Sequence, residues 1–425
     1  MHYYGKDSEM AIVARGRMDG LQEITEADAM ARAEVLWAVA LERGSNRSRW
    51  KCDSYSLSAD YKESLDSVLF NDVPASSVYS DVPEWLLRQC NNDRITAINS
   101  NQPLALKRTS FMPGVGKKIN IVGLGDVGGT LAIGMRLLGG DCVREIGIYG
   151  GGNTNAEKRW EAELNQILDA SDPGKMPFVR IISEDALFDC DIFAFCASAG
   201  VPPLGTEVQD VRLVQYEANA AIIEQYAKAA RKTEFQGIFA VVSDPVDLLC
   251  AKVFAVSNQD ETGRFDYKGL LPEQIRGYGL GVMYARAAYY AGINGCLEEY
   301  LSSGRVYGPH GEGLIIANSL TDYDESCSQL LTEMTVKANI VVRETGFKPY
   351  IAPAISSGAL SLLGTIRGDW HYCSTFINGT FLGARNRISS HGIEVERINA
   401  PLALMGKIKE TYSLVREMSE RCCEL

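Results

Sequence analysis

Residues 118–138 read KINIVGLGDVGGTLAIGMRLL, and this stretch decides the fold. A short apolar run leads directly into Gly123, Gly125 and Gly128, and apolar residues at helical spacing follow to the end of the stretch. Glycines at these three places allow a tight turn, close approach of a pyrophosphate to the backbone, and close packing of helix against strand. The stretch therefore predicts a strand, a phosphate-binding loop and a helix whose positive dipole end faces the phosphates.

Asp126 and Val127 complete this loop, and we expect them to contact a dinucleotide together with the three glycines. A glycine turn of purely structural meaning is the alternative, because the motif alone is weak. The motif begins a long series of strands, and that position favours a dinucleotide site.

Downstream of the loop, short apolar runs alternate with segments of helical periodicity, which is typical of βαβ units in a parallel sheet. The expected strands are 119–122, 145–149, 178–182, 192–196, 237–242 and 274–278. Six such strands complete an α/β, doubly wound Rossmann domain over residues 117–280. Longer helical patterns and Gly-punctuated segments predict an α+β domain over 281–425.

Residues 1–110 have a different texture and are interpreted as a small N-terminal extension that serves as interface or cover. Thr25 and Asp28 predict a helix cap, and apolar residues at helical spacing predict that this helix continues to Leu41. A second short helix is expected at 84–90. The polar stretch 91–110 is interpreted as a linker, although its Ile-Thr-Ala-Ile segment could be an added strand.

Composition excludes several classes of function. The net charge of −12 and the isoelectric point near 5.0 would repel a phosphate backbone, so we expect no nucleic-acid partner. No apolar stretch is long enough to span a membrane and the first residues do not resemble a signal peptide, so we expect a cytoplasmic protein. The 11 cysteines include no C-x-x-C pair, which predicts reduced thiols and no metal site.

The end of the second expected strand lacks the acidic residue that usually binds the adenosine ribose. Gly150, Asn153 and Thr154 make a neutral turn there, and Lys158 and Arg159 follow it. This turn would accept a 2′-phosphate, so the cofactor could be NAD or NADP. Lys158 and Arg159 could equally be a solvated helix face.

Several motifs are spread in order over 117–425. They are the glycine loop, CASAGVPPLG at 196–205, VVSDPVD at 241–247, GYGLGVMYAR at 277–286 and GPHGE at 308–312. With these motifs the chain resembles the lactate/malate dehydrogenase family of L-2-hydroxyacid dehydrogenases. The resemblance implies that Ala197, Ser198 and Ala199 contact the cofactor and that the protein is a homo-oligomer, either a dimer or a tetramer.

His310 resembles the family's histidine, which exchanges a proton with the substrate oxygen while hydride moves. An imidazole suits this role because its ordinary pKa near 6.5 lets it give and take a proton at neutral pH. Arg286 matches the arginine that binds the substrate carboxylate through a planar guanidinium. A structural ion pair is the alternative for Arg286.

The chain departs from the family where the aspartate that orients the histidine is expected, because that position is Met283. Asp244 stands where the family has asparagine before the proline. We therefore expect Asp244 to orient His310 and to stabilise its protonated form. A turn aspartate that caps its own backbone is the alternative.

The loop after the fourth strand also departs from the family. Arg212 is the nearest match to the family's polarising arginine, and Leu204 occupies the position that reads the substrate side chain. Leucine would leave a second carboxylate unpaired, so we expect an apolar or aromatic substrate side chain. Ser356, in APAISSGA at 352–359, is expected to leave room opposite this loop.

Together these residues predict an oxidoreductase that transfers a hydride between NAD(P)H and a 2-keto or 2-hydroxy carboxylic acid. Met283 and the altered loop keep open a catalytically impaired cofactor-binding protein. A redox-assisted glycosidase is a further alternative, for which Cys250 and His310 would have to bind a metal.

Overall fold

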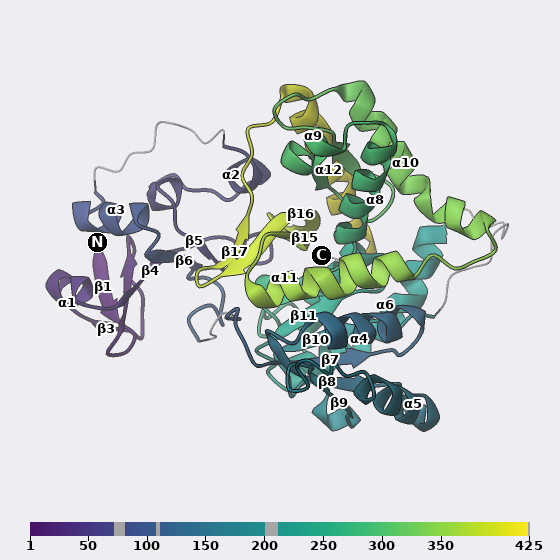
Figure 1. Cartoon of the computed structure of the whole chain (residues 1–425). Coiled ribbons are helices and arrows are strands. Elements are labelled where there is room, and N and C mark those ends of the chain that lie inside the picture. Colours follow the sequence, from purple (N-terminus) through teal and green to yellow (C-terminus); the bar gives the residue numbers. More distant parts are fainter. Residues whose placement is uncertain (72–80, 108–110, 200–210, 424–425) are drawn as a thin grey trace.

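The computed structural model describes residues 1–71, 81–107, 111–199 and 211–423, which form a nine-stranded sheet, a six-stranded sheet and a two-stranded ribbon (Figure 1). The strands of the large sheet are β7 (Lys117–Val122), β8 (Val143–Tyr149), β9 (Phe178–Ile181), β10 (Ile192–Phe195), β11 (Ile238–Val241), β12 (Ile275–Gly277), β15 (His371–Ile377), β16 (Thr380–Ser389) and β17 (Gly392–Val395). The ribbon consists of β13 (Arg305–Tyr307) and β14 (Ile315–Ala317).

The six strands from β7 to β12 form the parallel part of the large sheet, in the order β12-β11-β10-β7-β8-β9. The strand order reverses between β10 and β7, and ligands of doubly wound sheets bind at such a reversal, beyond the carboxyl ends of the strands. The predicted α/β doubly wound fold is therefore confirmed, with each expected strand in place.

The last three strands are antiparallel and extend the same sheet beyond β12. Gly277 of β12 pairs with Ser374 of β15, so the C-terminal part continues the hydrogen-bonded ladder of the Rossmann part. The domain boundary predicted at residue 280 lies at the point where β12 is followed by helix α8.

Helices cover both faces of the large sheet (Figure 1). They are α4 (Asp126–Leu138), α5 (Thr154–Asn165), α6 (Val211–Lys232), α7 (Val246–Ser257), α8 (Leu280–Ile293), α9 (Leu297–Ser303), α10 (Glu325–Glu344), α11 (Ser361–Arg367) and α12 (Leu402–Cys423). A π-helical segment, η4 (Pro353–Leu360), precedes α11, and short 3-10 turns are η2 (Glu184–Ala186) and η3 (Pro272–Gln274).

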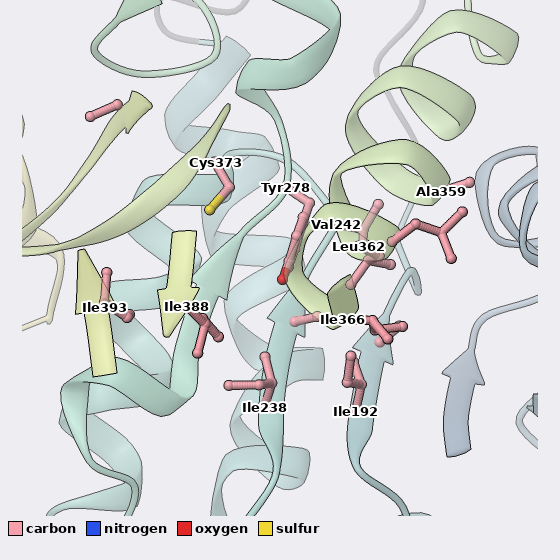
Figure 2. Packing of buried hydrophobic residues seen from close by; sticks show 14 of the residues in the cluster. Ile192, Ile238, Val242, Tyr278, Ala359, Leu362, Ile366, Cys373, Ile388 and Ile393 are labelled. Carbon is pink, nitrogen blue, oxygen red and sulfur yellow. The ribbon is translucent and has the colours of Figure 1, made fainter. Parts of the chain in front are cut away.

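One buried apolar cluster joins the parallel and the antiparallel parts of the sheet. Figure 2 shows Ile192 and Ile238, on neighbouring parallel strands, near Leu362 and Ile366 of α11. The opposite face of the sheet packs Phe193, Phe195 and Phe239 against α6 and α7. Because burial of apolar area is the main favourable term in folding, this two-sided core holds the carboxyl ends of the strands in fixed positions.

Residues 1–107 form a sheet of their own, in the order β3-β1-β2-β4-β6-β5. Its strands are β1 (His2–Gly5), β2 (Met10–Ala14), β3 (Gln22–Glu23), β4 (Glu34–Val39), β5 (Arg49–Lys51) and β6 (Ile95–Asn99). The accompanying helices are α1 (Glu26–Met30), the 3-10 turn η1 (Tyr55–Leu57), α2 (Leu65–Leu69) and α3 (Glu84–Asn91). The expected helix at 84–90 is confirmed by α3.

Two expectations for this N-terminal part are wrong. The capping box of Thr25 and Asp28 is present, but α1 ends at Met30, and Glu34–Val39 is the strand β4 between β2 and β6. Val35 and Trp37 favour a strand, and parallel pairing on both sides outweighs the helical spacing of the apolar residues. The interpretation of 91–110 as a linker fails at β6, whose five residues are all buried, and the alternative that the Ile-Thr-Ala-Ile segment is an added strand is confirmed.

The N-terminal sheet docks on the large sheet through buried polar contacts. The Glu273 carboxylate accepts the backbone N–H groups of Ser48 at 2.6 Å and Arg49 at 3.2 Å. Burial raises the pKa of Glu273, and these donors oppose that rise. Thr96 of β6 hydrogen-bonds His391 at 2.8 Å, next to β17. The N-terminal part therefore packs against the β17 edge.

Candidate active site

The glycine loop has the geometry that the sequence predicts. Gly123 has φ +91°, and a Cβ there would lie 2.5 Å from the backbone nitrogen of Ala197. A Cβ on Gly128 would lie 1.9 Å from the carbonyl oxygen of Gly123. Gly125 is the N-cap of α4, and a Cβ there would meet no atom within 4 Å. The loop thus leaves open space at the N-terminus of α4, where a pyrophosphate would fit.

Two side chains tie the segment after β10 to the turn that follows β11, and the Cys196 N–H donates to the Val122 carbonyl of β7 at 2.8 Å. Ser243 Oγ donates to the Ala197 carbonyl at 2.7 Å. The fully buried Asn219 accepts the Ala199 N–H at 2.9 Å and donates to the Asp244 carbonyl at 2.7 Å. The carboxyl ends of β7, β10 and β11 are therefore held as one unit.

Asp244 and His310 form a pair at this edge. His310 Nδ1 lies 2.8 Å from Asp244 Oδ1, and the His310 side chain is 10% exposed whereas that of Asp244 is 40% exposed. Gly279 lies against the imidazole, since a Cβ there would come within 2.9 Å of His310 Cβ. Nε2 of His310 is buried and has no hydrogen-bond partner among the described residues. Because a carboxylate can only accept, Nδ1 carries a proton in this pair.

Arg286 extends from α8 toward the same turn. Burial lowers the pKa of its guanidinium, and the charge of Asp244 acts in the opposite direction. Its Nη2 donates to Asn339 of α10, and its Nη1 lies 3.7 Å from Met283 Sδ. Within the described part of the chain, Arg286 forms no ion pair. The arrangement presents a guanidinium whose charge is available to an anion.

Met283 places a buried thioether beside Arg286, where the resemblance noted in the sequence implies a carboxylate. The structure supplies a carboxylate to His310 from the β11 turn instead. The proximity that the sequence predicted between Asp244 and His310 is thus present.

The end of β8 holds a carboxylate that sequence reasoning missed. Glu157 reaches back from the first turns of α5, and its Oε1 accepts the Gly150 N–H at 2.8 Å. Burial raises the pKa of Tyr149, the last residue of the strand, and the charges of Glu184 and Glu157 act in the same direction. The neutral turn expected from the sequence therefore lies beside acidic groups. The signal was an acid eight residues after the strand end, which is too distant for the usual motif.

The basic residues of α5 divide into two kinds. Arg159 pairs with Glu163 at 3.5 Å and lies 5.1 Å over the Trp160 ring, so it is engaged on its own helix. Lys158 is exposed. Asn153 caps the helix by accepting the Ala156 N–H at 3.2 Å, and Thr154 is its first residue.

Two predicted side chains lie outside the described residues, and a third predicted residue lines a cavity. Leu204 lies outside the described residues, and Arg212 lies in the first turn of α6 with its side chain likewise outside them. Ser356 of η4 lines a cavity together with Gly281, Tyr284 and Ala285. Helix positions advance by about 100° per residue, so these α8 residues face away from Met283 and Arg286. A role for Ser356 in the substrate pocket stays a prediction.

Comparison with known proteins shows the fold. No family model matches the sequence, and no curated protein matches it. Among solved structures, the minor L-lactate dehydrogenase from Enterococcus mundtii is 18% identical with a TM-score of 0.59, covering 72% of this chain and 98% of its own. The malate dehydrogenase from Archaeoglobus fulgidus in complex with NADH is 19% identical with a TM-score of 0.56, covering 72% and 99%.

A third similar structure is the lactate dehydrogenase from Eimeria maxima with NADH and oxamate, which is 18% identical with a TM-score of 0.57 over 73% of this chain and 95% of its own. The chain therefore has the fold of lactate and malate dehydrogenases over nearly three quarters of its length. The share of the chain that these structures do not cover is consistent with an additional N-terminal part. No helix among the described residues is long and apolar enough to cross a membrane.

Proposed function

We propose that this protein is a nicotinamide-dependent oxidoreductase that interconverts a 2-keto acid and the corresponding 2-hydroxy acid. The observation that carries the proposal is the Asp244–His310 pair, with a buried and unpartnered Nε2, beside Arg286 and at the strand ends that hold the glycine loop. A proton donor, an anion-binding guanidinium and a pyrophosphate loop in one place meet the needs of this reaction class.

In the reductive direction, Arg286 binds the substrate carboxylate and His310 Nε2 donates a proton to the carbonyl oxygen. Asp244 holds the imidazole by Nδ1 and stabilises its protonated form, so Nε2 stays directed at the substrate. Gly123, Gly125 and Gly128 would hold the pyrophosphate of a bound nicotinamide dinucleotide, which supplies the hydride.

Leu204 supports an apolar or aromatic substrate side chain, because a second carboxylate would find no cation at that position. For the cofactor, we favour NAD(H) over NADP(H), since the carboxylates of Glu157 and Glu184 flank the end of β8 and would repel a 2′-phosphate. A homo-oligomer, dimer or tetramer, remains part of the proposal.

The test is loss of absorbance at the reduced nicotinamide band with pyruvate, oxaloacetate, and branched and phenyl 2-keto acids, each with NADH and with NADPH. We expect turnover with at least one apolar or phenyl acid and NADH. Turnover with oxaloacetate alone would contradict the side-chain proposal.

Met283 beside Arg286 supports a second candidate, a protein of this fold that binds the cofactor and has lost turnover. Cofactor binding without consumption of either nucleotide across the whole panel would establish that candidate and remove the first.

A further inference from the structure

A cavity of about 460 Å³ lies on the side of α8 that faces away from Arg286. Its walls come from α8, α9, η4, α11 and the start of β15, and Arg305 and Arg385 also line it. A volume of this size lies within the range of small-molecule sites. None of the residues proposed for catalysis lines the cavity, so it is a separate place in the molecule.

The cavity carries an excess of positive charge. Arg305 binds Glu396 through two hydrogen bonds, at 2.6 and 2.9 Å, and Arg385 binds the same carboxylate at 2.5 Å. Two guanidinium groups thus share one carboxylate. His371, which also lines the cavity, adds no charge at neutral pH because burial lowers its pKa to about 3. The lining therefore retains one positive charge that an anion could neutralise.

Aromatic rings form much of the remaining wall. The rings of Tyr284 and Tyr372 stack with centroids 4.6 Å apart and an interplanar angle of 20°. Trp370 lies against two arginines of β16, with Arg385 at 5.5 Å and Arg387 at 4.8 Å from the ring centroid. Rings fixed in this way offer flat surfaces for a planar group.

The opposite wall is the π-helical segment η4, which contributes Ser356 and Leu360. Segments of π-helix are rare and are often found at functional sites. Here η4 packs closely on α8, since a Cβ on Gly281 would lie 2.5 Å from the Ser356 carbonyl oxygen. It also packs on α4, since a Cβ on Gly134 would lie 2.6 Å from Ala359 Cβ.

We propose that this cavity is a second small-molecule site, separate from the His310 site, that binds a planar aromatic carboxylate. The anion pairs with the guanidinium groups of Arg385 and Arg305, and the ring packs against Tyr284 and Trp370. The occupied cavity lies between the helix that carries Arg286 and the segment that supports the glycine-loop helix. The site is therefore placed to bind a regulatory ligand.

The test is isothermal titration calorimetry of the full chain with sodium benzoate and with its uncharged counterpart, benzamide. We expect one benzoate site per chain, with benzamide at least about tenfold weaker because it lacks the charge. Arg385→Gln should weaken benzoate binding by at least about tenfold. Equal affinity for benzoate and benzamide would overturn the proposal.

Arg387→Gln is the matched control, because Arg387 lies on the same strand and the same tryptophan but pairs with Glu394 and does not line the cavity. It should leave benzoate affinity within about twofold. Arg286→Gln should also leave it within about twofold, and loss of binding in that variant would place the anion at the His310 site and overturn the proposal.

Two further outcomes decide the remaining cases. If Arg385→Gln does not fold, the anomalous signal of 4-bromobenzoate in crystals of the unmodified chain shows whether the bromine lies beside Trp370, and density elsewhere contradicts the proposal. If benzoate does not bind and Arg385→Gln instead changes the subunit number in light scattering, the cavity belongs to a contact between copies of the chain and the proposal is wrong.

Discussion

Two clusters in the C-terminal half combine a histidine with a buried arginine, and they differ in what the histidine contacts. His310 has one nitrogen on the Asp244 carboxylate and the other buried without a partner among the described residues. His371 has both nitrogens occupied, by the Asp369 carbonyl at 2.8 Å and Thr365 Oγ1 at 3.0 Å. The first cluster leaves a site for a reacting atom, whereas the second is closed.

The two arginines differ in their exposure to solvent. Arg276 is fully buried inside the sheet, and its Nη2 donates to Asn386 and, at 2.9 Å, to Cys373 Sγ. Arg286 lies beside the carboxylate turn, at the edge where the strands end. Residue type therefore does not separate a functional cluster from a structural one, but the partners of the histidine nitrogens do.

The largest expected effect is on the His310 cluster. His310→Asn should lower kcat/KM by about 10²–10⁴-fold, because asparagine cannot exchange a proton with the substrate oxygen. The midpoint of thermal unfolding should change little, since the asparagine amide can still donate to Asp244 in place of Nδ1, and Nε2 forms no hydrogen bond among the described residues. Steady-state kinetics and thermal unfolding on the same preparation check both parts, and an unchanged kcat/KM would place the proton donor elsewhere.

The opposite pattern is expected for the second cluster. His371→Ala should lower the free energy of unfolding by about 2–4 kcal/mol, because it leaves a cavity against Gly364 and removes two hydrogen bonds. Turnover per folded molecule should stay within about threefold, because the hydrogen bonds of His371 reach Thr365 and Asp369 and none of the residues proposed for catalysis. Urea unfolding and active-site-normalised kinetics measure the two quantities. A loss of turnover at full stability would erase the distinction between the clusters.

The pH dependence of stability sharpens this prediction. The folded-state pKa of His371, about 3, lies below the ordinary value near 6.5, so the unfolded chain binds the proton first. The contribution of the neutral His371 to the free energy of unfolding is complete above pH ~6.5 and falls as the pH decreases toward 3. Between pH 7.5 and 5 we expect the loss of about 2 kcal/mol of unfolding free energy.

His371→Ala should lack this component of the pH dependence. Glu273 has the opposite effect on the pH dependence of stability. Burial raises its pKa, so its contribution to the free energy of unfolding is lost as the pH rises. The difference between the unmodified chain and His371→Ala at each pH therefore isolates the histidine. A constant difference across the range would show that His371 is not neutral and closed in the folded state.

The smallest expected effect concerns the cofactor side of the first cluster. Glu157→Gln keeps the acceptor for the Gly150 N–H and removes the negative charge. The ratio of NADPH to NADH affinity should rise by roughly threefold to tenfold, because a 2′-phosphate would meet less repulsion. Fluorescence titration of each reduced cofactor measures the ratio.

Glu161→Gln is the control for this change. Glu161 lies on the same helix but accepts the Ile181 N–H at 2.9 Å, at β9 rather than β8. Its substitution should leave the affinity ratio unchanged, and an equal rise in both variants would mean that Glu157 does not discriminate between the cofactors.

Much of the large sheet could be predicted because its strands are short apolar runs separated by helical patterns, and the glycine loop fixes where the first one ends. The N-terminal sheet could not be read in the same way. Val35, Trp37 and their neighbours have helical spacing, and only pairing with β2 and β6 makes them a strand. Such pairing joins residues distant in sequence, which local periodicity does not record.

The candidate site, too, could be predicted from the sequence only in part. His310, Arg286 and the place of Asp244 follow from motifs, because each motif sits at the end of a strand or the start of a helix. Glu157 does not, since its carboxylate reaches the end of β8 only after α5 folds back over the turn. The aromatic and basic cavity beside Trp370 draws on seven separate elements, so no single stretch of sequence indicates it.

The central claim is that Asp244 orients His310. The resemblance places an aspartate with this role at position 283, where the chain has Met283, whose side chain cannot accept a proton. The most direct measurement of this claim is the kcat/KM of Asp244→Asn beside the unmodified chain, with NADH and the best 2-keto acid of the panel. We predict a fall of about 10²–10⁴-fold with unchanged NADH affinity and thermal stability, because asparagine cannot stabilise the protonated imidazole. Equal kcat/KM in the two proteins would contradict the account.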